Sequence, residues 1–110
     1  MAYDEDLAGR IRVLLGADSG VTERRMFGGL AFLAGGRLAV AASGKGGLMV
    51  RVEPAETDAL LAEPGVGVIE MRGRPLDGWV RVEADALRSD RDLEAWVQRG
   101  VRFARSLPET

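Results

Sequence analysis

The sequence of 110 residues contains no cysteine and no histidine. Without cysteine the chain has no disulfide, no thiolate nucleophile and no cysteine-bound metal. Without histidine it lacks the most common general base, the most common zinc ligand and the side chain that titrates near neutral pH. No pair of carboxylates is placed by the sequence to work as acid and base. These absences predict that the protein is not an enzyme and that it uses no metal ion and no cofactor.

Long apolar segments are also absent. The longest uncharged stretch, residues 26–36, is too short and too rich in glycine to span a bilayer. The acidic start, residues 1–6, lacks the apolar core of a signal peptide. Hydrophobic residues make up 46% of the chain and charged residues 29%, a balance typical of a folded domain rather than a disordered segment. We therefore expect one cytoplasmic domain, residues 1–110, with no membrane contact.

The net charge is small, at −2, but the charges are unevenly distributed. Residues 21–51 contain one acid and five bases, and residues 71–82 contain one acid and three bases. Residues 52–70 contain five acids and no base. The basic segments coincide mostly with predicted strands. Binding of nucleic acid through these strands is therefore an alternative function, which the small net charge and the acidic segment argue against.

Hydrophobic periodicity and turn residues divide the chain into helices and strands. Apolar residues at helical spacing predict a first helix at residues 4–15 and a last helix at residues 91–106, the latter capped by Ser89 or Asp90. Pro54 suits the first position of a middle helix. The other predicted elements are strands at residues 21–27, 30–33, 37–42, 48–52, 66–71 and 79–82, the middle helix at 54–62, a loop at 73–78 and a helical turn at 84–88.

Helices before, between and after groups of strands indicate an α+β fold with two layers, an antiparallel sheet and helices on one face of that sheet. The strands at residues 30–33 and 37–42 lack polar alternation, so both of their faces are expected to be buried. Helices would cover only one of the two faces. We expect a second copy of the chain to cover the other, because most soluble oligomers are symmetric. The sequence therefore predicts a homodimer.

Glycines mark the turns between the predicted strands. Gly35 and Gly36 are typical of a tight hairpin, which needs positive φ. Gly28 and Gly29 are interpreted as a structural break in a strand, with an edge that contacts a partner as the alternative. Residues 43–47 superficially resemble a phosphate loop, but the first glycine, the hydroxyl after the lysine and the following helix of that motif are missing. A flexible loop is predicted there instead.

Several spaced segments resemble the N-terminal domain of the TfoX/Sxy family. They are residues 25–32 (Arg-Met-Phe-Gly-Gly-Leu-Ala-Phe), 48–52 (Leu-Met-Val-Arg-Val), 71–80 (Met-Arg-Gly-Arg-Pro-Leu-Asp-Gly-Trp-Val) and the ending 96–108, and the opening 1–4 is also typical. The resemblance covers the whole chain. It implies the order α-β(3)-α-β(2)-α, similar to type III secretion chaperones, and it brings no catalytic residues.

The best-known members of this family are transcriptional co-activators of natural competence. They carry a second, helical C-terminal domain, which this sequence lacks after Thr110, so a stand-alone N-terminal domain is expected. The leading hypothesis is a non-enzymatic protein-interaction or regulatory module with an unidentified protein partner. The alternatives are weak binding of nucleic acid, or binding of an anion or small molecule at the arginine-containing loop, residues 71–78.

Arginines from several predicted strands and loops could gather into a basic patch, since the guanidinium group binds carboxylates and phosphates through two hydrogen bonds. The competing interpretation is a solvated face paired with the acidic segment, residues 52–70. Tryptophan is either an interface anchor or a core residue. The predicted partner-contact residues are Arg24, Arg25, Phe27, Gly28, Gly29, Arg51, Arg72, Arg74 and Trp79, and Arg81 belongs to the same possible patch.

Overall fold

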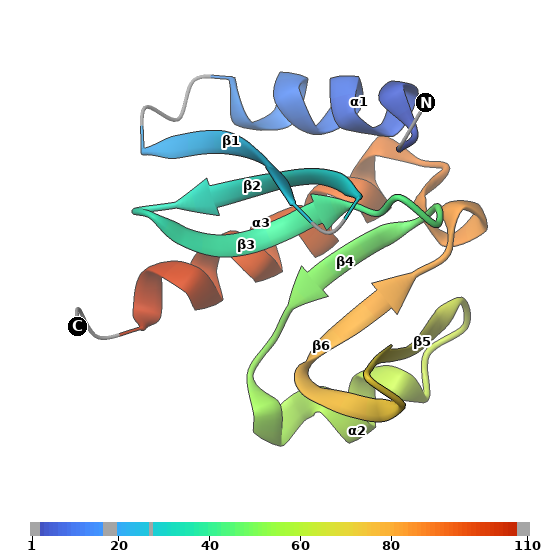
Figure 1. The fold of residues 1–110 in the computed structure, drawn as a ribbon. Helices are drawn as coiled ribbons and strands as arrows, with labels where there is room; N and C mark the ends of the chain where they lie inside the picture. The colour runs from blue at the N-terminus through green and yellow to red at the C-terminus, as the bar shows by residue number, and fades with distance from the viewer. Residues whose placement is uncertain (1–2, 17–19, 27, 108–110) are drawn as a thin grey trace.

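The computed structural model describes residues 3–16, 20–26 and 28–107. Figure 1 shows helices and strands that form two layers, which confirms the predicted α+β class and the antiparallel sheet. The elements are α1 Glu5–Leu15, β1 Val21–Met26, β2 Gly29–Ala34, β3 Arg37–Ala42, β4 Leu48–Arg51, the 3₁₀ helix η1 Pro54–Glu56, α2 Thr57–Leu61, β5 Val66–Met71, β6 Arg74–Val82, the 3₁₀ helix η2 Ala84–Leu87 and α3 Asp90–Ser106.

The family resemblance implied three strands before the middle helix, and the structure has four. β1 and β2 are antiparallel, with Met26 paired to Gly29, so the chain reverses its direction between them and cannot continue as one strand. Gly28 lies in this reversal with a φ of 74°, in the left-handed region. Phe27, the predicted last residue of the first strand, lies outside the described residues.

The strands form one sheet in the order β1-β2-β3-β4-β6-β5, and each neighbouring pair is antiparallel. The hairpin predicted at Gly35 and Gly36 is confirmed, because both have positive φ and lie between the paired residues Ala34 and Arg37. Figure 1 shows a strong twist between β3 and β4. β4 pairs with β6, which is not its neighbour in the sequence, and β5 forms the edge of the sheet beyond β6.

β6 is longer than the sequence predicts. The prediction of a loop at residues 73–78 is wrong, since β6 begins at Arg74. The turn consists of Arg72 and Gly73, with φ of 56° and 79°, a conformation that suits the twist of a two-residue hairpin. Pro75 is tolerated within β6 because β4 pairs only with residues 79–82, which leaves one side of the strand without a ladder at the proline.

The helices begin near the predicted residues. Ser89 rather than Asp90 is the cap of α3, since its Oγ accepts a hydrogen bond of 3.0 Å from the amide of Asp92. The middle helix is divided into η1 and α2 and ends at Leu61, one residue earlier than predicted. Among the described residues, no helix has the length and apolar character needed to cross a membrane.

All three α-helices pack on the same face of the sheet. Their buried residues, among them Leu7, Leu60 and Val97, belong to one hydrophobic cluster with strand residues such as Phe32. α3 approaches β3 so closely at Gly100 that an added Cβ would lie 2.6 Å from a backbone oxygen of β3. Among the described residues, no helix lies on the opposite face of the sheet, as the sequence predicts.

Candidate interaction surface

The sheet face opposite the helices, called here the helix-free face, has its own hydrophobic cluster. Its buried members are the strand residues Ala31, Leu33, Ala41, Met49 and Ile69, and its partly buried members are Met26, Leu38, Leu76 and Trp79. The buried members are at most 8% exposed within a single chain. The prediction that both faces of the central strands are buried is confirmed. One chain already buries these residues, so their burial does not require a second copy. The homodimer stays a prediction.

One cross-strand row runs across the helix-free face. The register aligns, from β1 to β6, the residues Arg24, Ala31, Ala41, Met49 and Arg81. Residues directly opposite each other in an antiparallel ladder point to the same face, so both arginines lie on the helix-free face. Four strand spacings of about 4.8 Å place their Cα atoms roughly 19 Å apart. The row therefore has an apolar middle, which is already buried within the single chain, and an arginine at each end.

Arg51 and Trp79 lie beside this row and form one unit. They are paired across β4 and β6. The Cζ atom of Arg51 lies 5.9 Å from the centroid of the Trp79 ring, within the range of a cation–π interaction. The Nη1 of Arg51 also donates a hydrogen bond of 3.4 Å to the carbonyl oxygen of Leu38. Both side chains are half-buried, so an arginine and a tryptophan are held together at the surface of this face.

Arg81 holds the loop at residues 43–47 against the sheet. Its Nη1 donates hydrogen bonds to the carbonyl oxygen of Gly46, at 2.7 Å, and to the Oγ of Ser43, at 3.0 Å. The same Oγ accepts a bond of 3.1 Å from the amide of Lys45. The strand β4 follows this loop, which agrees with its interpretation as a connection between strands rather than a phosphate loop.

Carboxylates do not neutralise the arginines of the helix-free face within the described part of the chain. Arg24 is exposed, and its side chain has no hydrogen bond or ion pair with the described residues. The ion pairs recorded there involve other arginines: Arg10 with Asp90, Arg12 with Glu23, Arg88 with Asp85 and Arg99 with Glu56. Arg24 is therefore the exposed arginine of this face, whereas Arg51 and Arg81 are half-buried and donate to neutral oxygens of the same chain.

The structure brings three of the predicted contact residues to this face: Arg24, Arg51 and Trp79. Arg25 lies opposite Leu30, a member of the helix-packed cluster, so it points to the other face. Arg72 and Arg74 are exposed at the turn between β5 and β6, away from the row. The predicted patch of arginines is thus only partly formed.

Gly28 and Gly29 have geometric reasons to be glycine. An added Cβ on Gly29 would lie 2.1 Å from the carbonyl oxygen of Ala42, whereas Gly28 has free space but a φ of +74°. The close contact at Gly29 and the positive φ of Gly28 therefore explain both glycines without a partner. A partner contact at this edge stays a prediction, and Phe27 cannot be placed because it lies outside the described residues.

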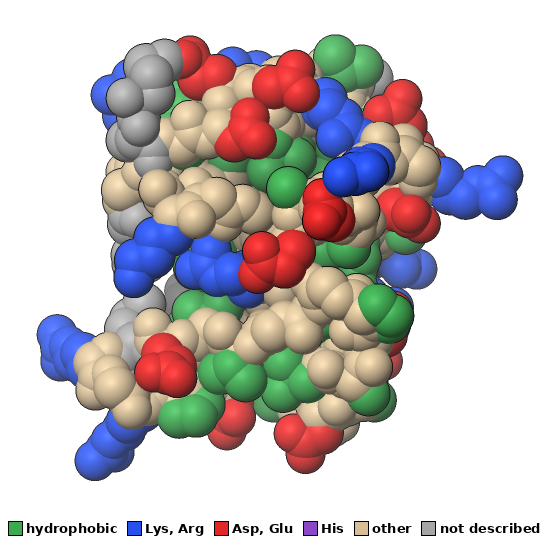
Figure 2. Space-filling model, turned by 90° about the vertical axis from the view of Figure 1, so that its right-hand side faces the viewer, with side chains coloured by type: hydrophobic (Ala, Val, Ile, Leu, Met, Phe, Trp, Pro, Cys, Tyr) green, Lys and Arg blue, Asp and Glu red, His purple; other side chains and the backbone are tan. Residues whose placement is uncertain are grey.

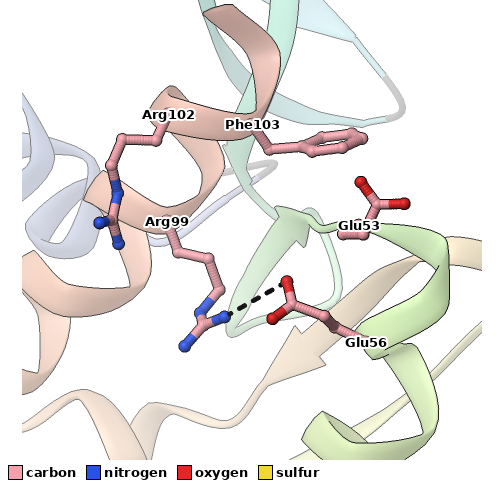
Figure 3. A pocket seen from close by; sticks show the side chains of 5 residues that line it. All are labelled: Glu53, Glu56, Arg99, Arg102 and Phe103. Carbon is pink, nitrogen blue, oxygen red and sulfur yellow. Dashed lines mark ion pairs between the residues drawn. The ribbon is translucent and has the colours of Figure 1, made fainter. Parts of the chain in front are cut away.

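A hollow of about 400 Å³ lies on the helical side, between η1 and α3. Its lining residues are Glu53, Glu56, Arg99, Arg102 and Phe103. Figure 3 shows Arg99 reaching towards Glu56, while Arg102 points away from both carboxylates. The Arg99–Glu56 contact measures 3.9 Å, and Arg99 also lies 5.5 Å from the ring centroid of Trp96. Because the hollow contains an ion pair between Arg99 and Glu56, it is a weaker candidate for a binding site than the helix-free face.

Arg12 of α1 holds Glu23 of β1 in a two-bonded pair. Its Nε and Nη2 donate hydrogen bonds of 2.8 and 2.9 Å to the two carboxylate oxygens. The hydrogen bond with Arg12 lowers the pKa of Glu23 below its ordinary value of 4.5, and the same bond raises the already high pKa of Arg12. Glu23 lies opposite Phe32, on the helix-covered face. The pair therefore fastens α1 to the outer strand and leaves the helix-free face unaffected.

Charges on another side of the molecule are mixed. Figure 2 shows basic, acidic and apolar side chains interspersed, without a large area of one sign. Strong binding of nucleic acid needs many positive groups along the path of the phosphates. The side in Figure 2 does not offer such a path.

The comparisons with known proteins agree with the sequence resemblance. A family model described as the TfoX N-terminal domain matches residues 14–104. Searches of curated proteins and of solved structures gave no match.

Proposed function

Because the chain belongs to the TfoX N-terminal domain family, we propose that it is a regulatory module that acts by binding another protein. The family is not known for enzymatic activity, and a non-enzymatic role is part of the proposal. The proposal also includes the cytoplasmic location that the sequence predicts. It further includes a role in competence or transcription, which the best-known relatives suggest.

The observation that carries the proposal is the helix-free face. It combines partly exposed apolar side chains with the half-buried pair of Arg51 and Trp79. Tryptophan and arginine are enriched among the residues that contribute most to protein–protein binding, since they offer large contact areas and directed hydrogen bonds. An apolar centre with a polar, charged border is also the usual anatomy of a protein interface, and the partly buried Met26, Leu38, Leu76 and Trp79 supply the apolar part here. The homodimer predicted from the sequence would be one form of such a contact.

The test is affinity capture with matched variants of the full chain. The wild-type protein, Arg24→Glu and Arg51→Gln are compared with Arg91→Glu, which makes the same charge reversal as Arg24→Glu at an exposed position of α3. We expect an identified partner to be captured by the wild type and by the Arg91 variant, and to be lost or reduced with the other two. Reciprocal capture with the tagged partner then confirms the contact.

Circular dichroism first establishes that all variants are folded. The proposal is contradicted if no partner is captured and light scattering also gives a monomer at micromolar concentration. Capture that is equal for all variants would contradict the helix-free face as the contact surface.

A further inference from the structure

We infer that a second copy of this chain binds along the edge of β5 that faces away from β6, called here the open edge, and that the two β5 strands pair antiparallel around a two-fold axis at Val68. This inference goes beyond the proposed function, because it concerns an edge of the sheet and leaves the helix-free face to another protein. It is carried by the direction of the backbone groups of β5, by the exposure of Val68 and by the charges at the two ends of the strand.

β5 is the last strand of the sheet and pairs only with β6 (Figure 1). The amide of Glu83 donates a hydrogen bond of 2.8 Å to the carbonyl oxygen of Gly65, so these two residues form a hydrogen-bonded pair at the end of the ladder. Such pairs alternate with non-hydrogen-bonded pairs in an antiparallel ladder, so the backbone groups of Val66 and Val68 point away from β6. The amide of Val66 agrees with this direction, because it donates to the carbonyl oxygen of Glu63 in the preceding turn, at 3.2 Å.

Glu70 also directs its backbone groups to the open edge. It lies opposite Pro75, one step from the hydrogen-bonded pair that closes the two-residue hairpin. Pro75 has no N–H to exchange with Glu70, which agrees with a non-hydrogen-bonded pair. The outward groups are therefore the carbonyl of Val66 and both the N–H and the C=O of Val68 and Glu70. None of them has a hydrogen bond within the described part of the chain.

The two edges of the sheet differ in how they are protected from pairing. β1, the other edge, carries four exposed polar residues, 22–25, and charged side chains on an edge strand oppose the addition of another strand. β5 instead begins with four uncharged residues, 66–69. Val68 among them is 45% exposed and is one of two exposed large hydrophobic residues in the described part of the chain. β5 is therefore the edge that favours an added strand.

A two-fold axis at Val68 pairs all the outward groups in one register. Val68 then lies opposite Val68 of the second copy, and Val66 lies opposite Glu70 of the second copy. The two Val68 residues exchange two hydrogen bonds and each Glu70 amide donates to a Val66 carbonyl, so about four new backbone hydrogen bonds form. Val68 is paired with Val80 and shares the helix-covered face with it, so the two Val68 side chains cover each other there.

The ends of β5 carry opposite charges. Glu63 lies in the turn before the strand and Arg72 in the turn after it. Both are exposed, and neither side chain has a hydrogen bond or an ion pair with the described residues. Antiparallel pairing brings the end of one strand beside the start of the other, so Arg72 lies opposite Pro64 of the second copy and next to its Glu63. The open edge is thus complementary to itself, as a two-fold interface requires.

Other arrangements fit the observations less well. A strand from an unlike protein would need a base beside Glu63 and an acid beside Arg72, whereas a second copy supplies both. A second copy on the helix-free face would cover a middle that one chain already buries. The open edge, by contrast, has backbone groups that only another strand can pair in a regular ladder.

The experiment follows the full-length protein by sedimentation velocity and by amide hydrogen exchange, from micromolar to millimolar concentration. We expect an equilibrium between monomer and dimer, with weak association because one strand pair makes a small interface. The amides of Val68 and Glu70 should exchange slowly only where the dimer forms, since they are open in the monomer. The amide of Gly67 faces β6 and should exchange slowly at every concentration, which makes it an internal control.

The variants test the register and the charges. Arg72→Glu and Glu63→Arg should each weaken the dimer about tenfold, because each places like charges side by side. An equimolar mixture of these two variants should recover the association, since each then meets the opposite charge at both contacts. Val68→Lys should abolish the dimer by placing two charges at the axis, whereas Val13→Lys, the same change at the other exposed valine, should leave it unchanged. Circular dichroism establishes that each variant is folded.

A monomer at millimolar concentration would overturn the inference. So would a dimer that protects amides of β1 or of the helix-free face instead of Val68 and Glu70, or a mixture of the charge reversals that associates no better than either variant alone. Protection of the β5 amides only after a captured partner is added would assign the open edge to an unlike strand and overturn the second copy. Capture through the helix-free face is tested separately by Arg24→Glu and Arg51→Gln, so the proposed function can stand or fail independently.

Discussion

Replacement of Gly29 by alanine should destabilise the protein far more than replacement of its neighbour Gly28. The new Cβ of Gly29→Ala would lie 2.1 Å from the carbonyl oxygen of Ala42 and 3.0 Å from the amide nitrogen of Gly44. Contacts of a Cβ shorter than 3.0 Å essentially never occur, so the backbone would have to move by about 0.9 Å, the difference between 3.0 and 2.1 Å. The movement falls beside the last pair of the β2–β3 ladder, Leu30 with Ala42.

The expected loss combines two effects. Forcing extra volume into a packed site typically costs about 1–3 kcal/mol, and weakening one ladder hydrogen bond costs about 1 kcal/mol. We therefore expect Gly29→Ala to lower the free energy of unfolding by about 2–4 kcal/mol, or the melting temperature by roughly 10–25 °C in a domain of this size. Gly28→Ala meets no atom within 4 Å and suffers only from its φ of +74°. Its cost should be about 1 kcal/mol.

Urea unfolding of both variants, followed by circular dichroism, measures this difference. The dependence of the free energy on urea should stay the same, because the surface exposed on unfolding does not change. Equal losses for the two variants, or a larger loss for Gly28→Ala, would refute the close backbone approach as the reason for glycine at position 29.

Three further substitutions test the fold and its electrostatics. Gly100→Ala should lower the free energy of unfolding by about 2 kcal/mol in urea titrations, although alanine favours helices, because its Cβ would lie 2.6 Å from the carbonyl oxygen of Ala39; a gain in stability would contradict the close packing. Ser89→Ala should cost about 1 kcal/mol in the same assay by removing the cap of α3, and an unchanged midpoint would exclude that role. Glu23→Gln should remove a pH-dependent part of the stability, because Arg12 lowers the pKa of Glu23 in the folded state. The wild type should exceed this variant in stability above pH 4.5, and the advantage should vanish as the pH falls through the lowered pKa; an advantage that persists in acid would contradict the pairing.

Much of the fold could be predicted because local patterns agree with the tertiary packing. The apolar stripe of residues 91–106 and the cap at Ser89 predict the bounds of α3 to within one residue. Gly35 and Gly36 predict the hairpin between β2 and β3. The start of β6 could not be predicted, because Gly73, Pro75 and Gly78 suggest a loop. Pro75 fits the strand only because β4 ends before reaching it, and that pairing joins segments far apart in the sequence.

The candidate surface was harder to predict than the fold. Arg24 and Arg25 are adjacent in the sequence, yet alternation along a strand sends them to opposite faces, and only the pairing with Leu30 and Ala31 assigns each face. Arg81 reaches the row through its pairing with Met49, which depends on the non-consecutive neighbours β4 and β6. The sequence did contain one signal: side chains two residues apart in a strand lie on the same face, which places Trp79 and Arg81 together.

The helix-free face as a protein-binding surface is tested most directly by mapping the captured partner on isotope-labelled protein. Amide shifts should concentrate at Arg24, Ala31, Met49, Trp79 and Arg81 in β1, β2, β4 and β6. They should disappear with Arg24→Glu and persist with Arg91→Glu. Shifts confined to α3 and η1, around the hollow in Figure 3, would contradict the account and place the binding site on the helical side.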